Sequence, residues 1–266
     1  MTGCGGVVST MKALNRAGQN QDVMTSSVRD GNASERIADG LRDAILRGEL
    51  PPGSRIRQEE VAAQYGASRI PVRGALRILE LQGLVELVAN SGAWVARFSL
   101  AECEEIYRMR ERIEPLLLRY SIPGLSAGTK EKIVELTGAM EAARDADAFL
   151  QLDREFHFLT YSGASTIVLG ATVERLWNST QVYRRAYTFL LDAPSIAIAH
   201  DEHRMLARAL EAGDGDQAEL VLLCHIRRTR QQLARHPDVF EAASGWNAAS
   251  TPAAGAAWPA RQSVIG

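Results

Sequence analysis

The sequence is poor in cysteine, and its few cysteines lie far apart. Only Cys4, Cys103 and Cys224 occur among 266 residues, and no two of them form a CxxC motif. An odd number of widely spaced cysteines excludes a disulfide framework and offers no thiolate cluster for zinc. This scarcity favours a reducing, cytoplasmic compartment.

Long apolar runs and a secretory leader are also missing. No stretch of the sequence approaches the roughly 18–20 apolar residues that a membrane span requires. The first residues, MTGCGGVVSTMKALNR, lack a charged segment followed by an apolar one, which is the pattern of a signal peptide. We therefore expect a cytoplasmic protein with no membrane partner.

Neither sign of charge is in excess, and aromatic residues are few. Thirty Lys and Arg residues against 32 Asp and Glu residues leave a formal net charge of −2. This balance argues against a polybasic chain that binds nucleic acid along its whole length, although a small basic surface remains compatible with it. Aromatic residues at 6% disfavour a β-sandwich and favour helices.

The order of patterned and unpatterned segments predicts two domains between two tails. Residues 1–30 are rich in Gly, Ser, Asn and Gln, and residues 241–266 in Ala, Gly, Ser and Pro. Because neither segment has apolar periodicity, we expect both tails to be disordered. Residues 31–97 and 105–240 carry regular patterns, and residues 98–104 form a linker that includes the start of the next helix.

The first patterned region predicts three helices followed by a β-hairpin, which is the outline of a winged helix-turn-helix. Apolar residues recur at helical spacing behind Ser34, a candidate N-cap, until Gly48 ends the helix. Ser68 stands at the N-cap position of the third helix, and Pro71 falls in its first turn, where a missing N–H costs nothing. The other expected elements are helices over 59–65 and 69–81 and strands over 84–88 and 93–97.

Three arginines form a stripe on the third predicted helix. Arg69, Arg73 and Arg77 follow one another at intervals of four residues, and no acidic residue occurs from 61 to 79. Such spacing stacks guanidinium groups on one face, where they can hold phosphates or read guanine edges. An isolated stripe of this kind is more often a solvated face with paired acids. The helix before it and the hairpin after it favour the DNA-binding interpretation.

The same region resembles the N-terminal domain of GntR-family bacterial transcription regulators. The shared patterns are G-x-L-x-P-G at 48–53, G-x-S-R-x-P-V-R-x-A-L at 66–76, G-L-V at 83–85 and G-x-x-V at 92–95. Two positions depart from the usual pattern, because Gln58 and Gly74 stand where glutamate is common. Gly74 is expected to weaken its helix by up to ~1 kcal/mol relative to alanine.

The resemblance implies that the third helix enters the major groove of a pseudo-palindromic double-stranded operator. It places Ser68, Arg69 and Arg73 on the DNA at the start of this helix. It also places the wing tip, with Asn90 and Gly92, near the minor groove. Pro71 and Arg77 complete the predicted DNA-binding set.

The second patterned region predicts an antiparallel all-α bundle. Short breaks such as Pro123-Gly124, Gly163 and the segment 213–215 separate helices of roughly 15–25 residues. The expected helices cover approximately 100–121, 127–145, 147–162, 165–189, 194–212 and 214–235. The fold class is therefore mainly α, with an N-terminal winged helix-turn-helix and a C-terminal bundle of about six helices.

One helix of this region carries a candidate metal-binding pair. Asp153 and His157 are four residues apart, so they share a helix face, although such a pair is more often a simple surface ion pair. His203 and His225 fall on the last two predicted helices. Three imidazoles and a carboxylate suit a divalent transition metal such as Zn²⁺, Ni²⁺ or Mn²⁺. His200 is a competing histidine, which is able to pair with His203 instead.

Residues 103–236 resemble the FCD effector domain of one large GntR subfamily, and more closely its metal-binding, VanR-like branch than its acyl-CoA-binding one. The segment EIYRMRERIEP, the D-x-x-x-H motif and the A-L-E-A-G-D run carry this resemblance. It implies that Asp153, His157, His203 and His225 hold the metal. It also suggests that Arg110 binds a carboxylate, whereas the sequence equally allows an intrahelical pair between Arg110 and Glu114.

Together these features predict a homodimeric, ligand-responsive DNA-binding regulator, expected to be a repressor, whose bundle senses a small carboxylic acid through its metal. Two alternatives stay open at this stage: a purely structural metal, and a metalloenzyme tethered to DNA. The sequence contains no Gly-rich phosphate loop and suggests no nucleophile–base pair, so we expect no catalysis.

Overall fold

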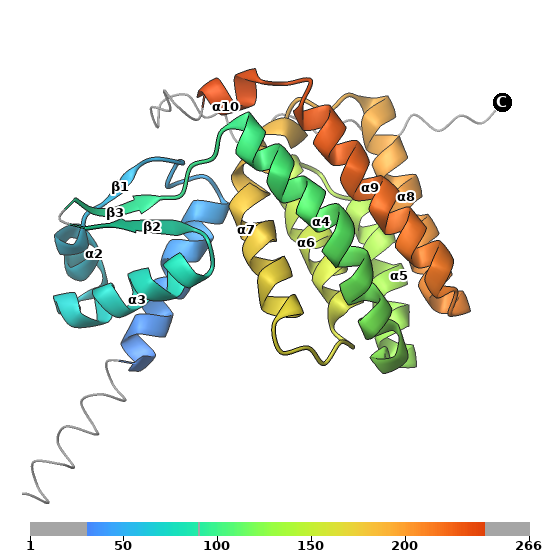
Figure 1. Cartoon of the computed structure of the whole chain (residues 1–266), viewed down its shortest axis with the longest axis horizontal. Helices are drawn as coiled ribbons and strands as arrows, with labels where there is room; N and C mark the ends of the chain where they lie inside the picture. The colour runs from blue at the N-terminus through green and yellow to red at the C-terminus, as the bar shows by residue number, and fades with distance from the viewer. Residues whose placement is uncertain (1–30, 90, 243–266) are drawn as a thin grey trace, which may run out of the picture.

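A computed structural model of the chain describes residues 31–89 and 91–242. Most of the predicted tails, 1–30 and 243–266, and the predicted DNA contact Asn90 lie outside these residues. The described chain forms a small winged domain beside a larger helical bundle (Figure 1). No helix in the described ranges has both the length and the hydropathy needed to cross a membrane.

The winged helix-turn-helix is present, with one strand more than predicted. Its three-stranded sheet has the order β1-β3-β2, with both pairings antiparallel. The unpredicted strand β1 is only two residues long, and it pairs Arg55 with Trp94 across the wing. The elements are a helix over 31–46, β1 (Arg55–Ile56), α2 (Gln58–Tyr65), α3 (Arg69–Leu81), β2 (Val85–Val88) and β3 (Gly92–Val95).

The expected N-cap at Ser34 is wrong, because the first described helix already covers 31–46. Ser34 lies inside this helix and is buried. A Cβ added at Gly74 of α3 would come within 2.4 Å of Ser34 Oγ. Gly74 therefore allows α3 to approach the first described helix closely. This packing explains why a glycine stands at a helical position, where it lowers helix stability.

The bundle contains the six predicted helices and one short helix after them. Its elements are α4 (Leu100–Ser121), the 3₁₀ turn η1 (Ile122–Gly124), α5 (Ala127–Glu141), α6 (Ala146–Tyr161), α7 (Leu169–Thr188), α8 (Ala193–Ala212), α9 (Gly215–Leu233) and α10 (Asp238–Ala242). The helix α7 begins four residues later than predicted. Thr166 Oγ1 accepts a hydrogen bond from the Gly170 backbone N–H at 3.0 Å, so Thr166 lies before the helix and helps to start it.

A capping box starts α4 directly after the winged domain. The Glu102 backbone N–H donates to Ser99 Oγ at 3.3 Å, and the Ser99 backbone N–H donates to Glu102 Oε2 at 2.7 Å. Both bonds satisfy amide groups that the helix start leaves unpaired.

We expect Ser99→Ala to lower the free energy of unfolding by about 1 kcal/mol, because alanine cannot accept the first of these bonds. Urea unfolding of the full chain, followed by circular dichroism, measures this change. An unchanged unfolding midpoint would show that the cap contributes nothing to stability.

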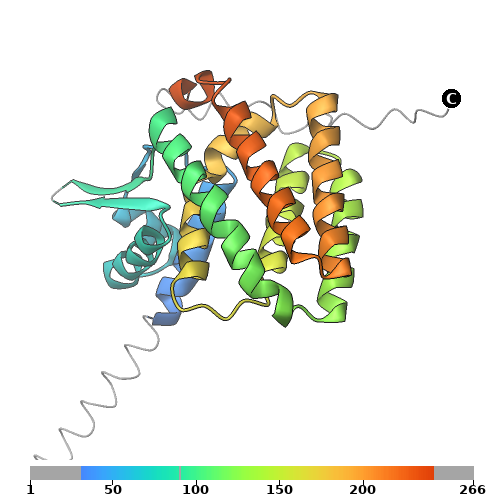
Figure 2. The same ribbon diagram turned by 45° about the vertical axis from the view of Figure 1, so that its right-hand side comes forward.

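The helix α7 joins the bundle to the winged domain. Figures 1 and 2 both show the winged domain beside α7. Tyr183 Oη accepts a hydrogen bond from the Phe98 backbone N–H at 2.6 Å, and Asn178 Nδ2 donates to the Gln82 carbonyl at 3.2 Å. Gln82 is the C-cap of α3, so one side chain of the bundle holds the end of the predicted DNA-reading helix.

Candidate metal and DNA-binding sites

The arginine stripe of α3 lies on the surface of the winged domain. Arg69, Arg73 and Arg77 are all exposed, and Ser68 is exposed at the N-cap position. Arg69 Nη2 lies 3.1 Å from Glu59 Oε1, a surface pair that contributes little to stability.

Pro71 is buried in the first turn of α3, so its contribution is to fix this turn rather than to face a ligand.

The wing completes this surface. A groove of about 540 Å³ separates α3 from the wing, and Arg73, Arg77 and Gly92 are among the residues that line it. The sequence prediction missed Arg55, because it missed strand β1. Arg55 and Arg57 line a neighbouring hollow together with Arg69 and Arg73, so they add two guanidinium groups to the surface.

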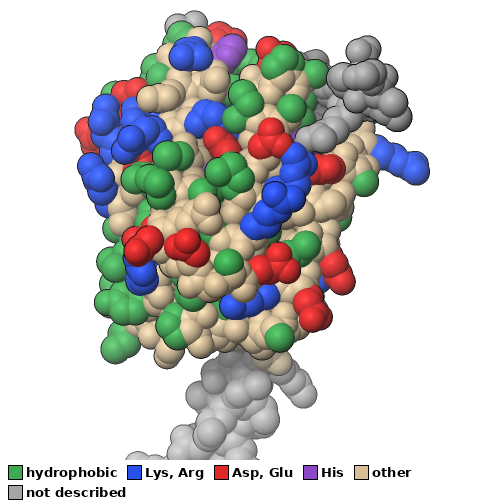
Figure 3. Space-filling model, turned by 90° about the vertical axis from the view of Figure 1, so that its right-hand side faces the viewer, with side chains coloured by type: hydrophobic (Ala, Val, Ile, Leu, Met, Phe, Trp, Pro, Cys, Tyr) green, Lys and Arg blue, Asp and Glu red, His purple; other side chains and the backbone are tan. Residues whose placement is uncertain are grey.

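On the side of the bundle turned away from the winged domain, acidic, basic and apolar side chains are interspersed (Figure 3).

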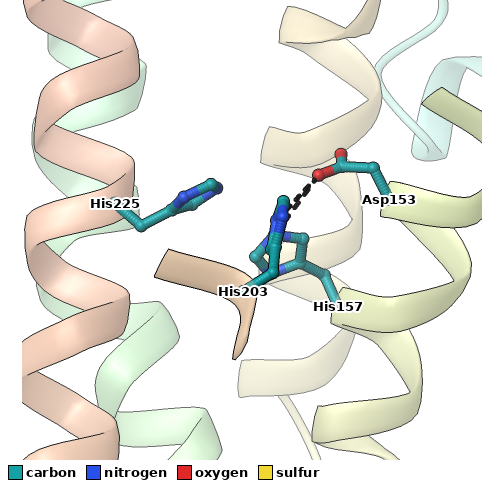
Figure 4. A group of neighbouring side chains, drawn as sticks. All are labelled: Asp153, His157, His203 and His225. Carbon is teal, nitrogen blue, oxygen red and sulfur yellow. Dashed lines mark ion pairs between the residues drawn. The ribbon is translucent and has the colours of Figure 1, made fainter. Parts of the chain in front are cut away.

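The structure brings the four predicted metal ligands together inside the bundle. Asp153 and His157 lie on α6, His203 on α8 and His225 on α9, and their side chains point toward one another (Figure 4). One ligand atom from each residue lies within 4.8 Å of all the others. His203 Nε2 is 3.1 Å and His157 Nε2 is 3.7 Å from Asp153 Oδ1.

The polar atoms of this cluster fit a metal ion. His157 and His203 are each 1% exposed, and both ring nitrogens of each make no hydrogen bond within the described part of the chain. Buried polar atoms without hydrogen bonds cost about 1–3 kcal/mol each, so their number here requires an explanation. A divalent ion would take up one nitrogen of each ring, because a neutral imidazole offers one lone pair to a metal.

The protonation states also suit metal binding. Burial raises the pKa of Asp153, but the Arg184 guanidinium and the neighbouring histidines outweigh this effect and hold the pKa well below its usual value. Burial lowers the pKa of His157 well below its usual value. An ionised carboxylate and a neutral imidazole are the forms that bind metal.

A carboxylate from outside the cluster orients His225. Glu202 Oε2 lies 2.7 Å from His225 Nδ1, and Arg228 holds both Glu202 oxygens at 2.8 and 2.6 Å. Burial raises the pKa of Glu202, but these two partners outweigh it and lower the pKa to about 2. The ionised carboxylate then accepts from Nδ1–H, so that Nε2 of His225 is left with its lone pair for the metal.

Arg184 of α7 is a further residue of this site that the sequence did not reveal. Arg184 Nη1 lies 3.3 Å from Asp153 Oδ2, and the guanidinium lies over the Trp177 ring at 3.9 Å. Because Arg184 faces Oδ2 of Asp153 and His203 faces Oδ1, the carboxylate of this metal-binding residue is held in one orientation.

Arg110 forms the intrahelical pair that the sequence allowed. Arg110 Nε donates to Glu114 Oε1 at 2.5 Å, and Nη1 donates to Thr180 Oγ1 at 3.0 Å. Glu114 Oε2 accepts further hydrogen bonds from Tyr161 and Trp177. The same arginine also lines the cavity beside the metal cluster, so its predicted contact with a carboxylate ligand stays a proposal.

That cavity is small, lies within the bundle and is partly open to solvent. Its volume is about 40 Å³, enough for about three water molecules. Three arginines, Arg110, Arg184 and Arg228, line it together with the metal cluster, and Leu150 and Ile226 add apolar wall.

Comparisons with known proteins agree with both halves of this architecture. The family model "Bacterial regulatory proteins, gntR family" matches residues 33–95, and the model "FCD domain" matches residues 105–228. The chain belongs to the GntR family.

GntR-family relatives also match across both domains. A "Probable D-xylose utilization operon transcriptional repressor" of Paenarthrobacter nicotinovorans is 29% identical over 77% of this chain and 90% of its own length. The "HTH-type transcriptional repressor RspR" of Escherichia coli K12 is 25% identical over 73% of this chain and 85% of its own. The structure titled "E. coli McbR/YncC" has a similar fold, with a TM-score of 0.65 at 21% identity over 77% of this chain and 98% of its own.

The matching family and the two curated relatives are described as transcription regulators and not as enzymes. The expectation that the chain has no catalytic function is thereby confirmed, and the metalloenzyme alternative loses its support. FCD domains often bind a metal, which agrees with the Asp and His cluster.

We expect Glu202→Gln in this GntR-family protein to weaken metal binding by about 10–100-fold. Glutamine accepts a weaker hydrogen bond from His225 and leaves Arg228 without its partner carboxylate. Competition for Zn²⁺ with a chromophoric chelator measures the change. An affinity equal to that of the wild type would show that Glu202 does not support the metal site.

Proposed function

We propose that this regulator is a homodimeric repressor whose operator affinity changes when a small carboxylic acid binds at a divalent metal in its bundle. The winged domain, residues 31–97, reads the operator. The bundle, residues 105–240, is the effector and dimerisation domain. The observation that carries this proposal is the buried cluster of Asp153, His157, His203 and His225 beside a cavity.

The charges around the cavity explain why the effector is an anion. Each lining guanidinium has a carboxylate partner: Arg110 faces Glu114, Arg184 faces Asp153, and Arg228 faces Glu202. The charges of these three pairs balance, so a bound divalent ion adds positive charge in a region of low dielectric. Burying uncompensated charge is costly, and a carboxylate on the metal reduces that cost.

The dimer is supported by an apolar stripe on α4. Met109, Leu116 and Tyr120 recur at helical spacing on one side of this helix and are 47%, 46% and 58% exposed. A second copy of the chain that packs on this stripe would cover it. Two winged domains would then meet two operator half-sites about one helical turn apart.

A path from the metal cluster to α3 supports the regulatory link. Arg154 follows the ligand Asp153 on α6, and its Nη2 donates to Asn178 Oδ1 at 2.9 Å. Asn178 in turn donates to the Gln82 carbonyl at the end of α3. A movement of α6 at the metal therefore changes the support of the reading helix.

We expect Asn178→Leu to leave metal and acid affinity within about twofold of the wild type while reducing the acid's effect on operator affinity at least twofold. The variant removes both hydrogen bonds but keeps a side chain of similar size. Operator titrations with and without acid measure the effect, with Ser179→Ala on the neighbouring position as a control. If Asn178→Leu responds to acid like the wild type, the coupling does not run through this side chain.

The proposed function is tested in two steps on the full chain. First, the protein selects DNA duplexes from a random library, and its affinity for these duplexes and for unselected DNA is measured at increasing salt. A specific regulator binds the selected duplexes more tightly. Second, a thermal-shift screen of short organic acids is run with and without Zn²⁺, Ni²⁺ or Mn²⁺. Acids that raise the Tm only with metal support the sensor. A metal that raises the Tm while no acid binds would indicate a purely structural ion.

A further inference from the structure

Two buried tyrosines line the cavity. Tyr107 of α4 and Tyr187 of α7 are 1% and 4% exposed. Neither hydroxyl makes a hydrogen bond of normal geometry within the described residues, and Thr180 is a polar neighbour of the Tyr107 hydroxyl. Both side chains line the cavity beside the metal cluster. Buried tyrosine hydroxyls ordinarily have a partner, because leaving one unpaired costs free energy.

Each of the two tyrosines lies one helical turn from an arginine that also lines the cavity. Tyr107 lies one helical turn before Arg110, and Tyr187 lies one turn after Arg184, so α4 and α7 each present a phenol next to a guanidinium. The Arg184 Nε is also buried without a partner among the described residues. These atoms come from α4 and α7, whereas the metal ligands come from α6, α8 and α9.

We infer that Tyr107 and Tyr187 select a short acid that carries a second oxygen function, either a hydroxyl or a further carboxylate, in addition to the carboxylate held at the metal. This inference rests on the proposed function and specifies the ligand of the same site.

The chemistry of the phenols supports this selection. Burial raises the pKa of Tyr187 to about 12, so its hydroxyl stays protonated and able to donate. Arg110 and Arg184 already hold Glu114 and Asp153, so the groups left to donate at that end of the cavity are the phenols and Arg184 Nε. The small size of the cavity favours a short acid over a long one. A plain aliphatic acid would leave both hydroxyls unpaired.

Two matched pairs of acids test the inference by titration calorimetry on the Zn²⁺-loaded full chain. Lactate and propionate differ by one hydroxyl, and succinate and butyrate differ by one carboxylate. In at least one pair, the acid with the second oxygen function is expected to bind about tenfold more tightly. A preference for lactate identifies a neutral hydroxyl as the recognised group, and a preference for succinate identifies a second carboxylate.

The tyrosines are then tested singly. Tyr187→Phe or Tyr107→Phe is expected to reduce the preference to below about threefold while leaving the affinity for propionate and butyrate unchanged. Tyr183→Phe, one turn earlier on α7 and outside the cavity lining, is the control and should keep the preference. The inference is overturned if the two acids of each pair bind with equal affinity, or if Tyr107→Phe and Tyr187→Phe both keep the wild-type preference. Either result leaves the proposed acid-sensing function intact. If no acid binds the wild-type chain, the proposed function fails and this inference fails with it.

Discussion

Arg69→Ala is expected to lower affinity for the selected operator by at least about tenfold while leaving the fold and the metal content unchanged. A guanidinium that bonds a guanine edge in two places contributes about 1–3 kcal/mol of discrimination, and one on a phosphate contributes through counterion release. Arg69 is 63% exposed, and its ion pair with exposed Glu59 adds little to folding. Fluorescence anisotropy with a labelled duplex measures the loss.

The control for this experiment is Arg144→Ala, which removes the same charge from an exposed position between α5 and α6. It should bind the operator like the wild type, because Arg144 lies in the bundle. A salt titration separates two roles of Arg69. A lower salt slope indicates a lost phosphate contact, whereas relaxed sequence preference indicates a lost base contact. If Arg69→Ala and Arg144→Ala bind equally well, α3 is not the reading helix.

His203→Gln is expected to weaken metal binding by at least about 100-fold, since even changes to groups behind the ligands cost 10–100-fold. His203 Nε2 lies 3.1 Å from Asp153 Oδ1, at the centre of the cluster. Glutamine keeps the size and polarity of the site but offers a poorer ligand for a transition metal. Chelator competition and metal analysis of the purified chain measure the loss.

His200→Gln provides the matched control, because His200 lies one turn earlier on α8 and is also buried. It should keep wild-type metal affinity, which would separate loss of a ligand from loss of any buried histidine. Thermal unfolding of both variants without metal checks that each remains folded. Equal metal affinity of His203→Gln and the wild type would remove His203 from the ligand set.

The sequence predicted those parts of the site that one helix determines by its own spacing. Asp153 and His157 are four residues apart on α6, so the helix alone brings their side chains to one face. His203 and His225 were assigned by resemblance to the FCD domain, because spacing within one helix says nothing about which helices pack together. Glu202 was not assigned a role, since its contact with His225 depends on how α8 lies against α9.

Contacts between elements that are distant in the sequence also explain the errors in the predicted fold. The helix α3 has the predicted bounds, 69–81, because glycine turns, apolar periodicity and Pro71 all agree there. Strand β1 was missed because two residues carry no periodicity, and only pairing with β3 makes them a strand. The reason for Gly74 is its close approach to Ser34 of another helix, which local sequence does not report.

In the proposed regulator, acid bound at the metal changes how the winged domains hold DNA. Coupling of this kind is reciprocal, so the factor by which acid changes operator affinity equals the factor by which operator changes acid affinity. The most direct test measures the operator dissociation constant of the Zn²⁺-loaded full chain with and without a saturating acid from the thermal-shift screen. A change of at least about fivefold is expected in the wild type and none in His203→Gln. An operator affinity that the acid leaves unchanged in the wild type would contradict it.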